Sequence, residues 1–384
     1  MSIYKLNQLL SALDGNSIPE WKLSSDLIYN HRKEVERFID DGGSAYGFTT
    51  FLGHLDRFSV EQNTQDLVLD AHLVGSPDSI SIRKMRAITA IKICQLSHGK
   101  NGISSKTYLD LILHFSKMES GSIDLRASYG SGDVVPASWW VNSIFNDHYS
   151  FADGDIISLI NGQFVAAGIA LYNYKSFDDF IARSEDCLNK ASQSINFGNV
   201  QTSVSLRDIS PILRFNQFAK ERLANELSNS ANLPSGNPLF RRSGDSSTLA
   251  SYSNSSFLNF ELSNAIGSAI EAIKVTSSYL RSATAQICSE LESREGELIR
   301  GAFFVQPPKV SKAYHDQILY LTSAPIASSQ SESYFIEDIS DGALVRANLL
   351  EDVLKLASSQ LDLLLQSLEA YGNGAGKTWR FYPE

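Results

Sequence analysis

The chain has 384 residues, and 33 Lys and Arg against 43 Asp and Glu give it a formal net charge of −10. No block of basic residues stands out, which argues against a general nucleic-acid-binding protein. The 43% of hydrophobic and 20% of charged residues are typical of a soluble globular protein, not of a disordered or coiled-coil chain. No stretch approaches ~18 uninterrupted apolar residues, and the first residues lack a signal-peptide core, so we expect a cytoplasmic protein with no membrane partner.

The predicted elements are mainly helices. In chain order, we expect helices at residues 82–96 and 105–117, followed by two long helices at residues 257–292 and 342–370. In the two long segments apolar residues recur at i, i+3, i+4 and i+7, which is the period of an α-helix. Alternating patterns typical of strands are short and few. The sequence therefore predicts a mainly α fold built as a bundle of long helices, and apolar residues on several helix faces favour an oligomer.

The sequence carries no pattern of a metal site, a nucleotide site or a disulfide framework. The three cysteines, Cys94, Cys187 and Cys288, are far apart and form no CxxC pair, which fits a reducing compartment. The histidines show no HExxH or paired-ligand spacing, and no GxxxxGK[ST] or GxGxxG motif follows a predicted strand. We therefore expect no metal and no nucleotide cofactor.

Ser131 stands between two glycines in the segment Tyr129-Gly130-Ser131-Gly132-Asp133. Glycines permit positive φ and a close approach of the backbone, so this segment is predicted to form a tight turn. It is not a Gly-x-Ser-x-Gly nucleophile elbow, because the glycines flank the serine directly and no strand precedes it. Taken alone, the tripeptide indicates an ordinary flexible turn.

Two loops carry the most informative patterns. Residues 45–53 read Ala-Tyr-Gly-Phe-Thr-Thr-Phe-Leu-Gly, and residues 130–136 read Gly-Ser-Gly-Asp-Val-Val-Pro. They resemble the Tyr-Gly-Val-Asn-Thr-Gly-Phe-Gly and Ala-Ser-Gly-Asp-Leu-x-Pro loops of the histidine and phenylalanine ammonia-lyase family. Further resemblances follow in the order of that family at residues 86–92, 99–103, 159–162, 200–207, 237–239, 257 and 336–338. Because the blocks keep their order, the chain resembles this superfamily of ammonia-lyases and aminomutases.

The resemblance implies a fold and an assembly. The fold would be the mainly α, long-helix bundle of the histidine ammonia-lyase (fumarase/aspartase-like) type, in one domain over residues 1–384. Residues 1–150 would form an N-terminal region of loops and helices with the tripeptide, and residues 151–384 the central bundle, with the C-terminal shielding region reduced or absent. The resemblance further implies a homotetramer in which loops of several subunits build each site for an amino-acid-like small molecule.

The resemblance also implies a prosthetic group made from the chain itself, the 4-methylidene-imidazol-5-one (MIO). The nitrogen of Gly132 would attack the carbonyl carbon of Gly130, and Ser131 would lose water to leave an exocyclic methylene group. The substrate amine adds to this electrophile and becomes a better leaving group. Glycine stands here in place of the family's alanine, but ring closure needs only the backbone carbonyl of this residue.

Roles for other residues follow from the same resemblance. Tyr46 would be the general base that removes the β-proton of the substrate. Arg207 would bind the substrate carboxylate with a bidentate fork, or alternatively serve as a structural ion-pair partner. Asn161 would orient the substrate and the imidazolone carbonyl. Glu337 would lie near the amine, or alternatively belong to a solvated helix N-terminus.

Three more residues are expected to contact the substrate. His72 stands where the family reads the substrate side chain, although a core histidine with satisfied hydrogen bonds is an equal alternative. Phe257 corresponds to the Gly-Asn-Phe-His block of the family, whose Asn and His are replaced by Ser256 and Leu258. Val204 stands in place of the family's second tyrosine.

The expected function is that of an ammonia lyase or a 2,3-aminomutase acting on an α-amino acid, in amino acid or specialised metabolism. The replacements at Val204, Ser256 and Leu258 keep two alternatives open. One is a divergent enzyme that uses Tyr46 and Arg207 for another addition, elimination or cyclisation without the imidazolone. The other is a non-catalytic paralogue that binds a ligand or a catalytic partner subunit.

Overall fold

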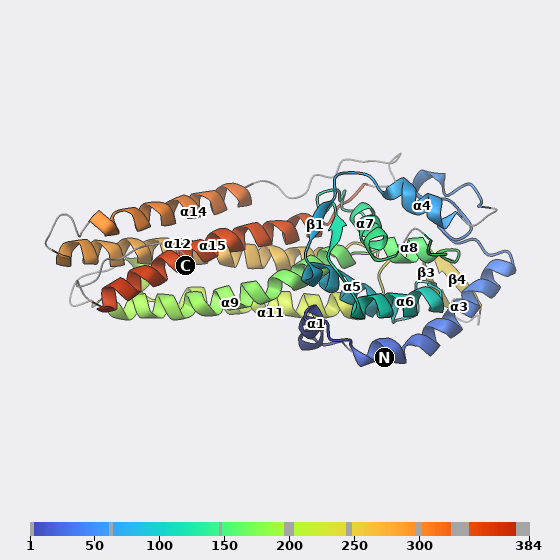
Figure 1. Ribbon diagram of the computed structural model, residues 1–384, viewed down its shortest axis with the longest axis horizontal. Helices are drawn as coiled ribbons and strands as arrows, with labels where there is room; N and C mark the ends of the chain where they lie inside the picture. Colours follow the sequence, from blue (N-terminus) through green and yellow to red (C-terminus); the bar gives the residue numbers. More distant parts are fainter. Residues whose placement is uncertain are drawn as a thin grey trace. The chain divides into compact units, whose positions relative to one another are not determined.

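The computed structural model divides the chain into two compact units, and helices predominate in both (Figure 1). The residues that it describes are 4–60, 64–145, 148–195, 203–242, 248–295, 302–323 and 338–373. The first unit comprises Met1–Tyr172, Ala224–Asn264 and Ile326–Asn348, and the second comprises Asn173–Leu223, Ala265–Pro325 and Leu349–Glu384.

The first unit contains short helices and two small sheets. Its helices up to residue 160 are α1 (Leu6–Leu13), α2 (Pro19–Leu23), α3 (Ser25–Asp40), α4 (Gln65–His72), α5 (Ile82–Leu96), α6 (Ser105–Ser116), α7 (Val134–Ile144) and α8 (Asp155–Ile160), with a 3₁₀ turn at Gly53–Leu55. Each sheet is one antiparallel pair of strands: β1 (Asp78–Ile80) with β2 (Gly121–Ile123), and β3 (Leu239–Arg242) with β4 (Leu249–Tyr252). Two-stranded pairs cannot form a core of their own, so helices provide it.

Helix α5 is a central core helix of the first unit. The Oγ of Ser81 accepts a hydrogen bond from the N–H of Lys84, as a serine at a helix N-cap does. Every residue from position 87 to position 96 is buried, so this part of the helix has no exposed face and is covered on all sides. The indole N–H of Trp21 donates to the Cys94 sulfur at 3.2 Å and ties α2 to this helix.

The second unit is built from segments of long helices (Figure 1). The remaining helices of the chain are α9 (Phe164–Ser194), α10 (Val204–Arg207), α11 (Ser210–Asn232), α12 (Phe260–Glu295), α14 (Gln306–Thr322) and α15 (Ala343–Asn373), with a 3₁₀ turn at Ala302–Phe304. A buried polar network joins three of them. Ser277 of α12 donates to the carboxamide oxygen of Gln360 on α15 (2.5 Å), and the Gln360 nitrogen donates to the hydroxyl of Ser311 on α14 (3.0 Å).

The mainly α fold predicted from the sequence is confirmed, and the four predicted helices are present. Helix α5 has the predicted bounds, and α6, α12 and α15 differ from the predicted bounds by at most three residues at either end. Two long helices, α9 and α11, are absent from the prediction. The few short strands agree with the weak strand patterns in the sequence.

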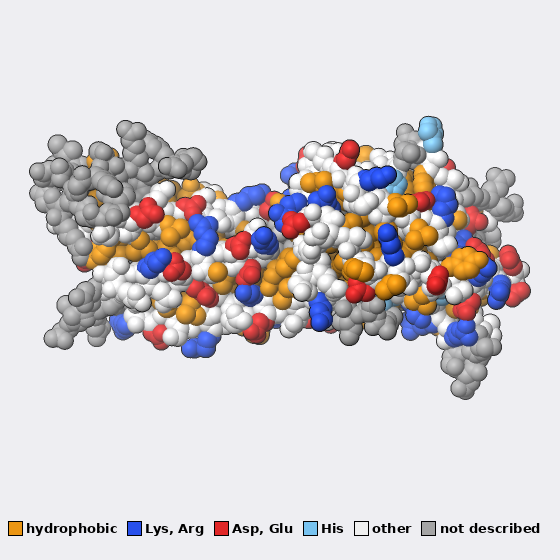
Figure 2. Space-filling model, turned by 60° about the horizontal axis from the view of Figure 1, so that its bottom comes forward, with side chains coloured by type: hydrophobic (Ala, Val, Ile, Leu, Met, Phe, Trp, Pro, Cys, Tyr) orange, Lys and Arg blue, Asp and Glu red, His pale blue; other side chains and the backbone are white. Residues whose placement is uncertain are grey.

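One described segment, Asp155–Ser194, is long and apolar enough to cross a membrane by composition alone. Within the protein, 94% of its most apolar window is buried, which is the pattern of a core helix. The surface instead carries charges of both signs, which are interspersed on the face shown in Figure 2. Some of them form ion pairs, as Lys190 does with Asp186 at 2.6 Å.

Candidate active site

A cavity of about 1040 Å³ lies within the first unit. It is formed by the loop after α3, helix α4, the loop before α7, helix α8 with the residue after it, and the loops beside β3 and β4. Its lining residues are Tyr46, Phe51, Leu52, Gly53, His54, Leu55, Asp56, Leu67, Val68, Ala71, His72, Tyr129, Ser131, Val134, Ile157, Asn161, Asn237, Ser253, Asn254 and Phe257. Apolar walls with a few convergent polar groups are typical of a small-molecule site.

The Gly-Ser-Gly tripeptide borders this cavity through the side chain of Ser131. Gly130 and Gly132 have φ angles of 86° and 92°, in the left-handed region that glycine adopts without strain. Ser131 is 7% exposed, and its hydroxyl donates a hydrogen bond to the carbonyl oxygen of Ile339 (3.1 Å). The N–H of Gly130 donates to the hydroxyl of Ser128 (3.0 Å). One hydrogen bond within the loop and one to a distant segment therefore hold this turn in place.

A buried carboxyl group, Asp133, and a partly buried one, Asp341, lie beside the tripeptide. Burial raises the pKa of Asp133 to about 7, a hydrogen bond from Ser128 (2.5 Å) partly offsets this, and the charge of Asp341 raises the pKa further. Burial also raises the pKa of Asp341, whose carboxylate accepts hydrogen bonds from the N–H groups of Asn259 (2.6 Å) and Ala343 (2.8 Å). The carboxyl group of Asp133 is therefore partly protonated at neutral pH.

Tyr46 lies in the loop between α3 and the 3₁₀ turn, and it lines the same cavity as Ser131. Its phenol oxygen accepts a hydrogen bond from the N–H of Gly53 at 2.8 Å. Gly47 has a φ of 68°, and the Ile157 side chain lies 2.9 Å from where a Cβ atom at Gly47 would be, so this loop packs directly on α8. The fold thus brings the general-base candidate and the tripeptide to one cavity.

Asn161 follows α8 and lines the cavity with a side chain that is almost fully buried. Its carboxamide oxygen, Oδ1, has no hydrogen-bond partner among the described residues. A buried acceptor without a partner costs about 1–3 kcal/mol, unless water or a ligand supplies a donor. Asn161 is therefore suited to accept a hydrogen bond from a bound molecule.

His72 and Phe257 also line the cavity. The Nδ1 of His72 lies 2.7 Å from the carbonyl oxygen of Val68, and because a carbonyl can only accept, Nδ1 is the donor of this hydrogen bond. The Phe257 side chain begins 3.4 Å from where a Cβ atom at Gly132 would be, so its ring packs beside the tripeptide.

The other three expected site residues are not in this lining. Val204 and Arg207 begin and end α10 in the second unit, and Val204 is 75% exposed. Glu337 lies outside the described residues. The described lining contains no lysine or arginine that could bind a substrate carboxylate.

The structure adds four polar lining residues that the sequence patterns did not single out. His54 and Asp56 follow directly on the loop at 45–53, and titratable residues beside a glycine-containing loop were a usable signal. Ser253 and Asn254 follow β4, and only the packing of distant segments brings them to the cavity.

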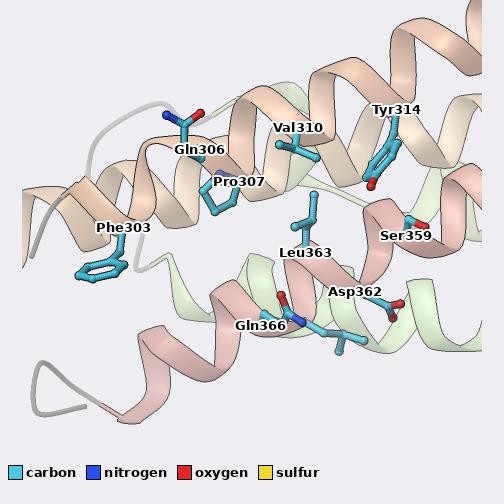
Figure 3. A pocket seen from close by; sticks show the side chains of 10 residues that line it. Phe303, Gln306, Pro307, Val310, Tyr314, Ser359, Asp362, Leu363 and Gln366 are labelled. Atoms are coloured by element: carbon cyan, nitrogen blue, oxygen red, sulfur yellow. The ribbon is translucent and has the colours of Figure 1, made fainter. Parts of the chain in front are cut away.

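A second cavity, of about 490 Å³, lies in the second unit between α14 and α15 (Figure 3). Pro307 and Val310 of α14 and Leu363 of α15 point toward each other across it. Asp362 is its one charged lining residue and pairs with Arg183 at 2.7 Å. Because its lining holds no free pair of titratable groups, this cavity offers less chemistry than the one beside Ser131.

Comparison with known proteins finds similar sequences and similar folds. Residues 22–158 match the family model described as aromatic amino acid lyase. The histidine ammonia-lyase of Alkaliphilus oremlandii (strain OhILAs) is 27% identical over 148 residues, which are 36% of this chain and 29% of that enzyme. The chain thus matches less than a third of the length of this curated relative.

Solved structures extend the likeness to nearly the whole chain. A phenylalanine aminomutase of Pantoea agglomerans superimposes with a TM-score of 0.78 at 14% identity, over 96% of this chain and 89% of that one. The ergothioneine-degrading enzyme ergothionase of Treponema denticola superimposes with a TM-score of 0.81 at 12% identity, over 96% of this chain and 88% of that one. Residues 22–158 are thus similar in sequence to the aromatic amino acid lyases, and nearly the whole chain is similar to these enzymes in fold.

The region that matches the aromatic amino acid lyase model contains Tyr46, His72, the tripeptide and α8 up to residue 158. The helices outside residues 22–158 are compared through the superposition with solved structures, which covers 96% of this chain for the phenylalanine aminomutase. The predicted fold of the histidine and phenylalanine ammonia-lyase type is therefore confirmed.

Proposed function

We propose that the protein is a carbon–nitrogen lyase or an aminomutase that acts on an α-amino acid through an imidazolone formed from residues 130–132. The observation that carries this proposal is that Tyr46, Ser131 and Asn161 border one cavity, although they come from three separate segments. The tripeptide fits the prosthetic group, because both glycines adopt positive φ and the side chain that would become the methylidene group lines the cavity.

The imidazolone, when formed, supplies an electrophilic carbon for the substrate amine. The other steps belong to side chains of the cavity. The Tyr46 oxygen, which the Gly53 N–H holds, takes the proton from the β-carbon as a general base. The free Oδ1 of Asn161 accepts a hydrogen bond from the amine.

The lining also indicates a class of substrate side chain. Phe51, Leu67 and Val134 provide apolar walls, and the imidazole of His72 provides a polar group. An amino acid whose side chain is largely apolar and ends in a hydrogen-bonding group satisfies both features.

We propose that Arg207 and Val204 complete the site from a neighbouring subunit of a homotetramer. The described lining contains no lysine or arginine, and Arg207 belongs to the second unit. A bidentate arginine is the side chain best suited to hold a carboxylate. The three cysteines are free and buried, which supports a place in the reducing cytoplasm.

A second candidate function is proton-transfer chemistry at Tyr46 without the imidazolone. It is favoured by the first position of the tripeptide, where Ser340 occupies the space that the methyl group of the family's alanine would need. The likeness in fold to ergothionase, an enzyme that degrades ergothioneine, also supports a wider range of reactions on this fold.

The mass of the intact protein tests the proposal. We expect it to be two water molecules below the mass calculated from the sequence, with a near-ultraviolet absorbance that Ser131→Ala abolishes. A wild-type mass equal to the calculated one would rule out the imidazolone. In that case, loss of turnover in Tyr46→Phe would favour the second candidate, and unchanged ligand binding without turnover would favour a non-catalytic protein.

Subunit complementation tests the shared site. We expect Ser131→Ala and Arg207→Ala each to be inactive, since each removes a group that every site needs. Co-expressed as mixed oligomers, the two variants form some sites that contain both wild-type residues, and these should restore part of the activity. Mixed oligomers without activity would contradict the assignment of Arg207 to a neighbouring subunit.

A further inference from the structure

Lys92 is a fully buried cation in the core helix α5. Its Nζ donates a hydrogen bond to the backbone carbonyl oxygen of Asn161 (2.9 Å) and lies 4.5 Å from the centre of the Phe164 ring. Among the described residues, no carboxylate forms an ion pair with it. Burial lowers the pKa of Lys92 to about 7, which reflects the cost of holding an ammonium group away from water. A methionine would fill the same space without that cost.

The two partners of Lys92 lie on the two sides of one turn. Asn161 ends α8 with φ −90° and ψ 131°, Gly162 follows with φ 139°, and Phe164 begins α9. The carbonyl oxygens at the end of a helix lack partners within the helix and carry partial negative charge, so a cation there is stabilising. The face of an aromatic ring attracts a cation as well. Lys92 thus bridges the end of α8 and the start of α9.

The side chain of Asn161 has no such support of its own. Its carboxamide forms no hydrogen bond within the described part of the chain, and Oδ1 is buried. The backbone of this turn is also held by the N–H of Asn161, which donates to the carbonyl oxygen of Ile157 (3.1 Å), and by a long contact from the N–H of Gln163 to the hydroxyl of Ser235 (3.3 Å). The direction in which the Asn161 side chain points therefore depends on its backbone, whose carbonyl group Lys92 holds.

We propose that Lys92 is a positioning residue of the candidate site, which acts through Asn161 by fixing the turn that aims the Asn161 carboxamide into the cavity. This inference rests on the proposed function, in which Asn161 binds the substrate amine. It explains why an unpaired cation is kept in the core where an apolar side chain would be more stable.

Substitution of Lys92 tests the inference. Lys92→Met keeps the length of the side chain but cannot donate, and we expect kcat/KM to fall about a hundredfold, as for a misplacement of about 1 Å. Lys92→Arg keeps the charge and the donors, so it should retain activity within about tenfold of wild type. The control is Lys84→Met on the same helix, whose ammonium lies over Tyr172 and not at Asn161, and which should change kcat/KM less than about twofold.

A double-mutant cycle separates positioning from general stability. If Lys92 acts through Asn161, Lys92→Met should lower kcat/KM less than about threefold when Asn161→Ala is already present, because residues that act as a unit are not additive. If the double variant loses kcat/KM by the product of the two single fold losses, the inference is overturned. It is also overturned if Lys92→Arg loses as much kcat/KM as Lys92→Met while both proteins remain folded.

Hydrogen exchange keeps the test independent of turnover. In Lys92→Met, amides of residues 161–168 should exchange at least about tenfold faster than in wild type, with little change in α6. If the wild type has neither imidazolone nor turnover, the proposed function fails, yet this measurement still decides whether Lys92 holds the turn. Unchanged exchange at residues 161–168, or equal acceleration in α6, would overturn the inference.

Discussion

The hydroxyl group of Ser340 occupies the space that a Cβ atom on Gly130 would need. The backbone of Gly130 also has a φ of 86°, which disfavours any residue with a side chain. Next to it, the Ser131 hydroxyl donates to the carbonyl oxygen of Ile339, so the segment that contains Ser340 lies against the first two residues of the tripeptide. The glycine at the first position therefore fits the close packing of this segment.

Replacement of Gly130 tests that relationship. Gly130→Ala should lower the free energy of unfolding by about 3 kcal/mol, from left-handed strain and from overlap with Ser340. Adding Ser340→Gly should recover about half of the loss, since the nearest remaining atom, the Cα of residue 340, is 3.1 Å away. Urea denaturation measures both changes.

Gly132→Ala is the matched control for this pair. Gly132 has a φ of 92°, but a Cβ atom there would meet only Phe257, at an ordinary 3.4 Å. This variant should show the backbone strain alone, about 1–2 kcal/mol. Equal losses in Gly130→Ala and Gly132→Ala would show that Ser340 is not in contact.

Asp133 should make stability depend on pH. Its pKa is raised from 3.8 to about 7 in the fold, so between about pH 4 and pH 7 the folded state binds more protons than the unfolded state. The stability from this group is fully present below pH 4 and is lost as the pH rises through 7. Asp133→Asn suits the φ of 51° and removes the titration, so it should be the more stable protein at pH 8, by up to about 4 kcal/mol.

Thermal unfolding from pH 4 to pH 8 checks this expectation. The exposed Asp153 offers the control variant Asp153→Asn, which should keep the pH dependence of the wild type. An Asp133→Asn protein whose stability still falls between pH 4 and pH 7 would place the titration elsewhere.

Tyr46→Phe should lower kcat about a thousandfold, because it removes a positioned general base while leaving the ring that lines the cavity. KM should change little, since the phenol hydroxyl is not assigned to substrate binding. Tyr252→Phe removes a hydroxyl from β4, outside the cavity lining, and should leave both constants near wild type. Steady-state kinetics measure both constants. Comparable kcat values for Tyr46→Phe and wild type would exclude Tyr46 as the general base.

The polar network of the second unit should contribute to stability. Gln360→Leu leaves the hydroxyl groups of Ser277 and Ser311 buried without their carboxamide partner, and we expect a loss of about 2 kcal/mol in the free energy of unfolding. Gln366→Leu, on the same helix at the second cavity, should change stability by less than about 0.5 kcal/mol. Similar losses for both variants in urea would show that the network adds nothing specific.

The long helices that the sequence predicted are those whose apolar residues recur with a clear helical period. Helix α12 repeats apolar residues at helical spacing, and so does α15. Helix α9 escaped prediction because every residue from 164 to 171 is buried, so its first turns have no polar face to mark a period. In α11, the buried positions include Asn216 and Ser230, and polar residues in a core stripe hide it.

The candidate site likewise contains residues that the sequence predicted and residues that it did not. The sequence named Tyr46, His72, Ser131, Asn161 and Phe257, because loop motifs are local and keep their order along the chain. The polar lining at Ser253 and Asn254 could not be predicted, since neither residue belongs to a motif.

By itself, the sequence determined the helical character of the chain, the tight turn around Ser131 and the loops that resemble a known family. These follow from interactions between residues close in the chain, which periodicity and glycine placement record directly. The tertiary structure alone decided that Ser340 fills the space beside Gly130 and that Lys92 holds the carbonyl of Asn161. Both contacts join segments far apart in the chain, and their existence depends on close packing of the whole first unit, which no local pattern encodes.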